Sequence, residues 1–351
     1  MNGLTADQQK QEAERLFALL STITNFKTKE KFSYEDCLKI APLSLCINQL
    51  KQKNDALILA HYYCTPDIVY GIADFKGDSY ALASKAVNAK EKNIIFCGVY
   101  FMAQTAKIIN PDKNVFLPPV TAGCSLADGI TVEEVKELKQ KYSDAAFVCY
   151  INSTAQVKAY CDVCVTSANV YDIVAKLPQK QIVFVPDLFM AENIRTELKR
   201  RNIEKEVFAF GSTCCVHDKY TVQDIEEIKK NHPSAKIISH PECAKEVSGL
   251  SDYCGSTSGM LAYVKNSTAT EFAVLSENGI INSLELENPS KTFYSTGRTC
   301  AQMKRNTLLN VLGVLENLSK APKVEVSGQT ALKAKKAIDN MFKMAGKQND
   351  R

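Results

Sequence analysis

The sequence predicts an α/β protein built from three homologous units, each a parallel sheet covered by helices. Apolar strand-like runs alternate with helix-like stretches along most of the chain, which is typical of parallel sheets with helical crossovers. Three similar segments end in cysteine, at Cys124, Cys214 and Cys300, and the steps between these cysteines are 90 and 86 residues. Steps of nearly constant size indicate an internal repeat.

The repeat becomes visible when the chain is shifted against itself. A shift of 88 places Asp74 on Asp162, and a shift of 90 places Asp162 on Asp252 and Tyr150 on His240. The matches occur in order, and each unit closes with a cysteine. The predicted parts are an N-terminal helical segment, three repeat units and a C-terminal helical tail, over residues 1–52, 53–142, 143–232, 233–318 and 319–351.

Two helices are predicted before the first unit. Leu16, Phe17 and Leu20 lie on one side of a helix over residues 5–20, which Thr5 or Asp7 would cap. Residues 34–52 form a second helical stretch, which we expect to be interrupted at Pro42 because proline lacks the backbone donor.

Apolar runs define the strands of the units. The first unit has strands near residues 56–60, 93–97 and 114–118; the second near 146–150, 162–165, 182–185 and 206–210; the third near 236–239, 252–254 and 272–276. Helical stretches lie between them, a hairpin-like stretch is expected at 277–287, and two helices are expected at 301–318 and 329–344. Ligands of such sheets bind at the carboxyl ends of the strands.

Composition limits the function classes. The formal charge of +4 suits small anionic ligands and is too weak to indicate nucleic-acid binding. No apolar run reaches the ~18–20 residues of a membrane span, and the polar, acidic start does not resemble a signal or transit peptide. Thirteen cysteines in such a chain indicate a reducing compartment, so we expect a cytoplasmic protein, or a plastid one if a transit segment was removed.

The three repeated cysteines are candidate metal ligands. Thiolates from three units meet only near a threefold centre, where they would hold zinc or an iron–sulfur cluster. Three protein ligands on a four-iron cluster leave one iron open as a Lewis acid. The alternative is that all three are ordinary buried thiols. The nearby pair Cys161 and Cys164 is interpreted as core packing.

Polar residues after the apolar strands are candidates for chemistry. His61 and His240 follow strands, His217 follows Cys214, and the same position is shared by Tyr63, Tyr150, Asn152 and Glu242. Tyr and Glu relay protons, and Asn donates to carboxylates. Hydroxyl residues precede helices at Ser79, at Thr166 and Ser167, and at Ser256, Thr257 and Ser258, where they would either bind anions or cap the helices.

These motifs together resemble the quinolinate synthase family. The resemblance rests on AHYY (60–63), ADFKGDS (73–79), FMAQTAKIINPDK (101–113), AGCSLAD (122–128), CCVHD (214–218), HPEC (240–243), GSTSGM (255–260) and CAQMKRNTL (300–308). It implies three Rossmann-like αβα units in a pseudo-threefold triangle around a [4Fe-4S] cluster. It also implies condensation of iminoaspartate with dihydroxyacetone phosphate to quinolinate in NAD biosynthesis, with the enzyme that supplies iminoaspartate as a possible partner.

The resemblance also implies site residues. The cluster ligands are Cys124, Cys214 and Cys300; Cys214 is chosen over Cys215 because the family places the ligand three residues before the histidine, and the repeat agrees. Tyr63, Glu242 and His61 are implied as catalytic. The implied substrate-binding residues are His61, Ser79, Tyr150, Asn152, Ser167, His217, His240, Glu242, Ser256 and Thr257.

One departure from the family pattern stands out. Gln104 stands where the family usually carries Glu, which leaves open an enzyme altered toward another acid. A second alternative is a non-catalytic iron–sulfur or zinc-binding sensor, in which the serine and histidine turns are only structural.

Overall fold

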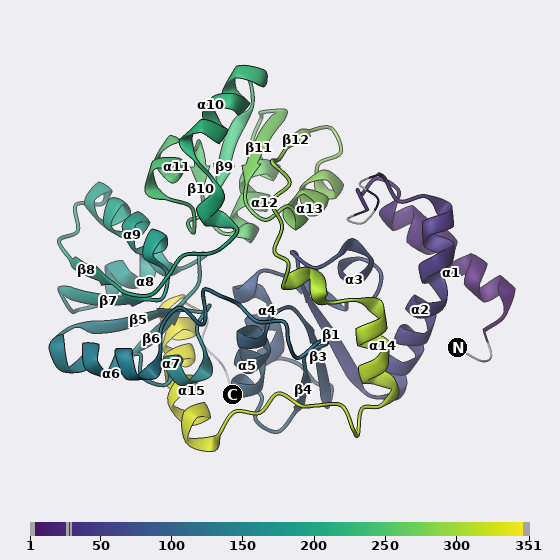
Figure 1. Ribbon diagram of the computed structural model, residues 1–351, viewed down its shortest axis with the longest axis horizontal. Helices are drawn as coiled ribbons and strands as arrows, with labels where there is room; N and C mark the ends of the chain where they lie inside the picture. Colours follow the sequence, from purple (N-terminus) through teal and green to yellow (C-terminus); the bar gives the residue numbers. More distant parts are fainter. Residues whose placement is uncertain (1–3, 26–27, 29, 347–351) are drawn as a thin grey trace. The chain divides into compact units, whose positions relative to one another are not determined.

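The computed structural model describes residues 4–25, 28 and 30–346 (Figure 1). Three four-stranded sheets are present, and every strand pair in them is parallel, which confirms the predicted α/β class with three sheet units. Within the described ranges no helix combines the length and apolar character needed to cross a membrane.

The chain divides into two compact units. Unit 1 comprises residues Met1–Gly123, Asn278–Lys291 and Thr299–Val324, and it holds the first sheet. Unit 2 comprises Cys124–Glu277, Thr292–Arg298 and Glu325–Arg351, and it holds the second and third sheets.

The N-terminal helices of unit 1 form a packed pair. Helix α1 (Ala6–Leu20) begins with a capping box in which Thr5 and Gln8 satisfy each other's backbone donors, as predicted for Thr5. Helix α2 (Tyr34–Lys53) contains Pro42 without interruption, so the expected break is wrong. Proline removes only one backbone hydrogen bond, and α2 stays helical because it packs against α1 and α14 (Leu308–Glu316).

The first sheet has the order β2-β1-β3-β4. Its strands are β1 (Ala56–His61), β2 (Phe75–Gly77), β3 (Asn93–Cys97) and β4 (Asn114–Phe116). The connecting helices are α3 (Pro66–Val69), α4 (Ser79–Val87) and α5 (Tyr100–Ile109). The short strand β2 was not predicted, because three residues are too few to show a period.

The second sheet has the order β6-β5-β7-β8. Its strands are β5 (Ala146–Tyr150), β6 (Val163–Val165), β7 (Gln181–Val185) and β8 (Glu206–Ala209). The helices are α6 (Val132–Lys141), α7 (Ala155–Lys158), α8 (Val170–Lys176) and α9 (Leu188–Arg200). The C-terminal helix α15 (Gly328–Met344) packs against β6 and α7 (Figure 1).

The third sheet has the order β10-β9-β11-β12. Its strands are β9 (Lys236–Ser239), β10 (Tyr253–Cys254), β11 (Glu271–Leu275) and β12 (Thr292–Tyr294). The helices are α10 (Val222–Asn231), α11 (Lys245–Leu250) and α12 (Thr257–Asn266). The stretch expected to be a hairpin is instead helix α13 (Gly279–Glu287), which belongs to unit 1; its Ile280, Ile281 and Leu284 are buried at helical spacing.

One hydrogen bond recurs in all three sheets and shows that the repeat is structural. An aspartate at the start of each second-strand segment accepts the backbone N–H of the first strand through Oδ2. The three pairs are Asp74 with Ile58 (2.8 Å), Asp162 with Phe147 (2.7 Å) and Asp252 with Ile237 (2.8 Å). The identical strand order and this shared bond place the carboxyl ends of equivalent strands at equivalent edges.

A buried hydrogen bond from Ser44 to Glu12 joins α2 to α1 and generates a prediction. Glu12 binds Arg15 through two bonds of 2.7 and 2.8 Å and accepts from Ser44 Oγ at 2.5 Å. We expect Glu12→Ala to lower the free energy of unfolding by about 1–3 kcal/mol, because it removes the acceptor of the buried Ser44 hydroxyl. Urea denaturation measures the change. The exposed Glu14 on the same helix is the matched control: an equal loss in Glu14→Ala would contradict the assignment.

Candidate active site

The predicted polar residues of unit 2 lie at, or just past, the carboxyl ends of strands in the second and third sheets. Tyr150 is the last residue of β5, and Asn152 follows two residues later. His240 follows β9 directly, and Glu242 lies in the same turn. Although β5 and β9 belong to different sheets, hydrogen bonds join Tyr150 and Asn152 to Glu242, so the carboxyl ends of both strands contribute to one region.

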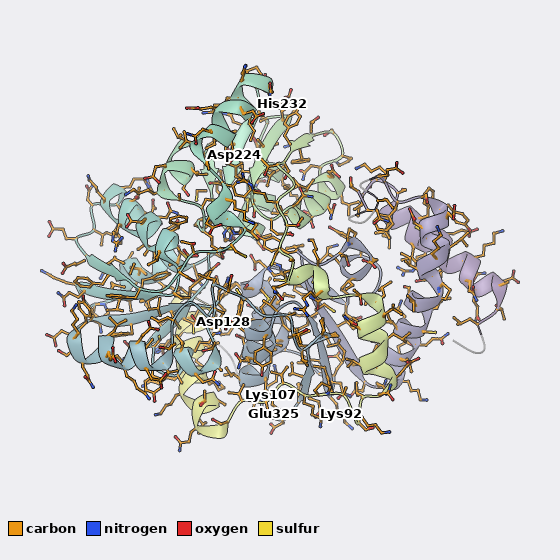
Figure 2. The ribbon with its side chains drawn as sticks, viewed as in Figure 1. Lys92, Lys107, Asp128, Asp224, His232 and Glu325 are labelled. Carbon is orange, nitrogen blue, oxygen red and sulfur yellow. The ribbon has the colours of Figure 1, made fainter. Side chains whose placement is uncertain are left out.

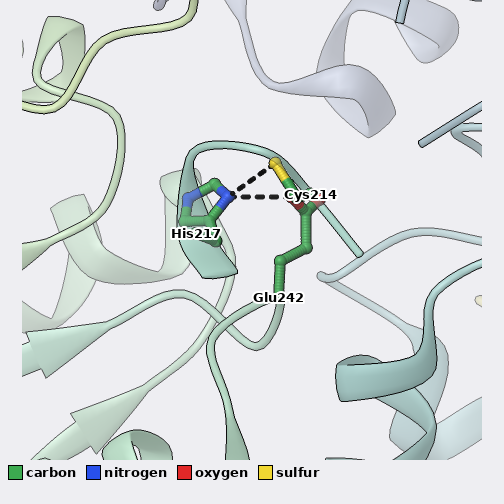
Figure 3. A group of neighbouring side chains, drawn as sticks. All are labelled: Cys214, His217 and Glu242. Atoms are coloured by element: carbon green, nitrogen blue, oxygen red, sulfur yellow. Dashed lines mark hydrogen bonds and ion pairs between the residues drawn. The ribbon is translucent and has the colours of Figure 1, made fainter. Parts of the chain in front are cut away.

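Glu242 is the centre of the contacts in this region. Its side chain is buried, at 4 % exposure. Tyr150 Oη donates to Glu242 Oε1 at 2.6 Å, and Asn152 Nδ2 donates to the same oxygen at 3.4 Å. His217 Nδ1 lies 2.9 Å from Glu242 Oε2 (Figure 3). The carboxylate therefore receives partners on both oxygens.

The surroundings determine the charge of Glu242. Burial by itself would raise the pKa of this carboxyl, but the positive character of His240 and His217, with hydrogen bonds from His217 and Tyr150, holds its pKa below the usual range. Burial and the Glu242 charge raise the pKa of the Tyr150 phenol well above its ordinary value. The pair is thus an ionised carboxylate and a neutral phenol donor.

His217 connects this network to Cys214. Its Nε2 lies 3.2 Å from Ser276 Oγ, and its Nδ1 lies 3.2 Å from Cys214 Sγ. The His217 ring stacks on His240 with ring centroids 4.7 Å apart. Burial, followed by the charge of Glu242 and the nearby Cys124 thiol, raises the pKa of Cys214. Two of the three predicted cysteines are therefore near each other within unit 2.

The hydroxyl residues at the helix starts differ in role. Ser256 is the N-cap of α12 and accepts from Gly259 N at 3.0 Å, so the capping interpretation is correct there. Thr257 is the first residue of the same helix. Ser167 does not cap α8, because the N-cap position of this helix is Asn169.

Unit 1 holds the other predicted polar residues. His61 ends β1, and its ring meets the Tyr63 ring edge-on with centroids 4.4 Å apart. Tyr63 N donates to His61 Nδ1 at 3.2 Å, which fixes the turn after the strand. Ser79 begins α4, but Asp78 caps this helix through a bond to Ala81 N at 2.9 Å. The Ser79 hydroxyl is therefore not required for capping.

Cys300 also belongs to unit 1, and the chain around it is well anchored. Gln302 Oε1 accepts from Gly123 N at 3.3 Å, so the backbone directly before Cys124 lies beside the segment that begins at Cys300. In unit 2, Arg298 donates twice to Asp224 (2.9 and 3.0 Å), the residue labelled at the base of α10 in Figure 2. Gln104 is buried in the interior of α5 and does not cap it.

Asp187 is a site residue that the sequence analysis missed. It caps α9 by accepting from Met190 N through Oδ1 at 2.9 Å. Its Oδ2 is buried with no hydrogen-bond partner among the described residues. Burial, followed by the charge of Glu242, raises the pKa of Asp187 well above its ordinary value, so it holds a proton. The repeat contained a signal, since a shift of 90 places Asp187 on Glu277, and both acids are fully buried.

The sequence matches one known protein family and is similar to named members of it. The family profile described as "Quinolinate synthetase A protein" matches residues 46–343. Proteins named quinolinate synthase from Fusobacterium nucleatum subsp. nucleatum and from Clostridioides difficile are each 40 % identical to this chain, covering 86 % of it and 98 % of their own length. The quinolinate synthase of Caldicellulosiruptor bescii is 42 % identical over 85 % of this chain and 97 % of its own.

The raised pKa of Asp187 predicts how two substitutions differ. The folded chain keeps a proton that the unfolded chain releases, so stability falls as pH rises above the usual aspartate range. Asp187→Asn, which resembles the protonated acid and keeps the cap, should reduce this fall. Asp187→Ala also removes the titrating group, and through the lost cap it should be about 1–2 kcal/mol less stable than Asp187→Asn at both pH values. Urea denaturation at pH 5 and pH 8 compares them; equal losses in both variants at both pH values would show that Asp187 is ionised.

Proposed function

Because the chain belongs to the quinolinate synthetase A protein family, it is an enzyme with quinolinate synthase activity in NAD biosynthesis, and we propose how its residues carry the reaction. Iminoaspartate condenses with dihydroxyacetone phosphate and loses phosphate and two waters to give quinolinate. The observation that supports the proposal is the buried Tyr150–Glu242–His217 network beside Cys214. It joins an ionised carboxylate to a candidate metal ligand.

The proposed cofactor is a [4Fe-4S] cluster held by Cys124, Cys214 and Cys300. All three cysteines are of intermediate exposure, and Cys124 lies close enough to Cys214 to raise its pKa. The bond between Gly123 and Gln302 supports the inclusion of Cys300, because it fixes the backbone next to two of the ligands. When bound by three thiolates, the cluster would supply one open iron as a Lewis acid.

We assign proton transfer to Glu242 and Tyr63. Glu242 is ionised, so its carboxylate oxygens are able to take a proton during isomerisation and ring closure. Tyr63 offers a phenol proton for the departing water, and His61 orients the tyrosine through the edge-on contact and the turn bond. Tyr150, a neutral phenol hydrogen-bonded to Glu242, holds the Oε1 atom of this carboxylate in place.

Substrate binding is assigned to the hydroxyl, amide and imidazole donors at the strand ends. The substrates carry two carboxylates and one phosphate, which favour charge-assisted hydrogen bonds and helix starts. The assigned donors are Ser79, Asn152, Ser167, His217, His240, Ser256 and Thr257. Ser79 supports this role most directly, because Asp78 already caps α4 and leaves the serine hydroxyl to a ligand.

Two substitutions test the proton-transfer roles. Tyr63→Phe and Glu242→Gln should each reduce turnover by roughly 100-fold or more, because each removes one proton-transfer group while preserving shape. Quinolinate formation under anaerobic conditions measures the effect, and iron content of the same samples checks that the cluster remains. Near-normal turnover in either variant would remove that residue from the mechanism. No product from the wild type under the same conditions would instead favour a non-catalytic sensor.

Anaerobic iron and sulfide analysis tests the cluster ligands. The wild type should be brown and contain about four irons per chain. Cys124→Ala, Cys214→Ala and Cys300→Ala should each lose most of this iron. The matched control is Cys215→Ala, since the exposed Cys215 adjoins Cys214 without being a proposed ligand. Loss of iron in Cys215→Ala together with retention in Cys214→Ala would reverse the ligand choice.

A further inference from the structure

We propose that Cys214, His217 and Glu242 form a site for a single divalent transition metal of the zinc type, which shares only Cys214 with the proposed cluster. All three residues lie in unit 2, and their ligand atoms lie within 4.8 Å of one another. Thiolate, imidazole and carboxylate are the three donors that four-coordinate zinc uses, and three protein ligands leave a fourth position open. Figure 3 shows the sulfur, the ring nitrogen and the carboxylate facing one another.

The arrangement of acceptors around His217 supports a cation at this position. Nδ1 faces the Cys214 sulfur at 3.2 Å and the Glu242 oxygen at 2.9 Å. A sulfur, a ring nitrogen and a carboxylate oxygen therefore converge on one point, with all three atoms within 4.8 Å of one another. A metal ion bound at the centre of the trio would neutralise the sulfur and the carboxylate together.

The surrounding side chains already orient the three donors. Ser276 Oγ lies 3.2 Å from His217 Nε2, and a hydrogen donated by Nε2 to this oxygen leaves Nδ1 as the metal-binding nitrogen. Stacking on His240 fixes the ring plane. Tyr150 donates to Glu242 Oε1, which leaves Oε2 as the carboxylate oxygen that faces His217 and the metal position. Metal sites depend on this kind of outer support for their affinity.

The distances require only a small adjustment. Zinc bonds of 2.0–2.3 Å at tetrahedral angles place neighbouring donors roughly 3.3–3.6 Å apart. The separations from Nδ1 are 3.2 and 2.9 Å, so the donors must open by a few tenths of an ångström. The third separation, between the Cys214 sulfur and the Glu242 carboxylate, is no more than 4.8 Å.

The single-metal site and the cluster compete for Cys214. This competition rests on the proposed function, in which Cys214 is a cluster ligand. Both use Cys214, whereas the mononuclear site uses neither Cys124 nor Cys300. A zinc ion bound to Cys214, His217 and Glu242 therefore removes one of the three cluster ligands. Cluster-free protein would take up the single ion, and cluster assembly would require its release.

Cobalt titration of chelator-treated, cluster-free protein under anaerobic conditions tests the site directly. Wild-type protein should bind one Co²⁺ per chain, with a thiolate charge-transfer band in the near ultraviolet and intense visible bands of four-coordinate cobalt. Cys214→Ser should lose the charge-transfer band, and His217→Gln and Glu242→Gln should each lose the intensity of the visible bands. The matched controls are Cys124→Ser and Cys300→Ser, which should titrate like the wild type.

A variant of a residue that is not itself a metal ligand keeps the test valid if a ligand variant misfolds. Ser276→Ala should weaken Co²⁺ binding by about 10–100-fold, because it removes the partner that orients His217. Loss of the bands in Cys124→Ser, with retention in His217→Gln, would overturn the proposal in favour of a cysteine-only site. The absence of a thiolate band in the wild type would overturn it as well.

Reconstitution with iron and sulfide separates this inference from the proposed function. Zinc added first should slow cluster formation in the wild type, and Ser276→Ala should reduce that delay. If chelated wild type forms no cluster yet binds Co²⁺ as described, the cluster proposal fails and the mononuclear site stands. If the cluster forms normally and Co²⁺ gives no thiolate band, the mononuclear site is rejected alone.

Discussion

The buried charge of Glu242 is the interaction on which the rest of the site depends. A carboxylate at 4 % exposure is costly unless donors surround it, and Tyr150, Asn152 and His217 supply them from separate segments of the chain. The same charge accounts for two neighbouring properties. It contributes to the raised pKa of Cys214, and it contributes to the proton held by Asp187. Substitution of Glu242 therefore alters a network rather than one contact.

The repeated architecture explains how these donors arrive together. Each sheet places its second strand beside its first through the same aspartate bond, at Asp74, Asp162 and Asp252. The order of strands is also the same in each sheet. Equivalent strand ends consequently carry functional residues of different types, such as Tyr150 in one sheet and His240 in the next. The repeat supplies the positions, and the individual residues supply the chemistry.

The two metal proposals share Cys214 and describe different states of one region. A cluster needs three thiolates, whereas a single ion is satisfied by one thiolate with His217 and Glu242. His217 and Glu242 thus have two roles in this account. They act on the substrate when the cluster is bound, and they are metal ligands when it is absent. The supply of iron and sulfide relative to zinc then determines which state forms.

The sequence by itself determined the α/β class, the three sheet units and most strands, because strands buried on both faces are continuous apolar runs. It also selected Cys214 over Cys215, a choice that stays a prediction. Tertiary structure alone decided that α2 continues through Pro42, that residues 279–287 form a helix, and that Asp78 rather than Ser79 caps α4. It alone joined Tyr150 to Glu242 and placed the buried Asp187 where burial and the Glu242 charge raise its pKa. Local patterns report burial and period, whereas contacts between residues some 90 positions apart depend on how the finished sheets pack.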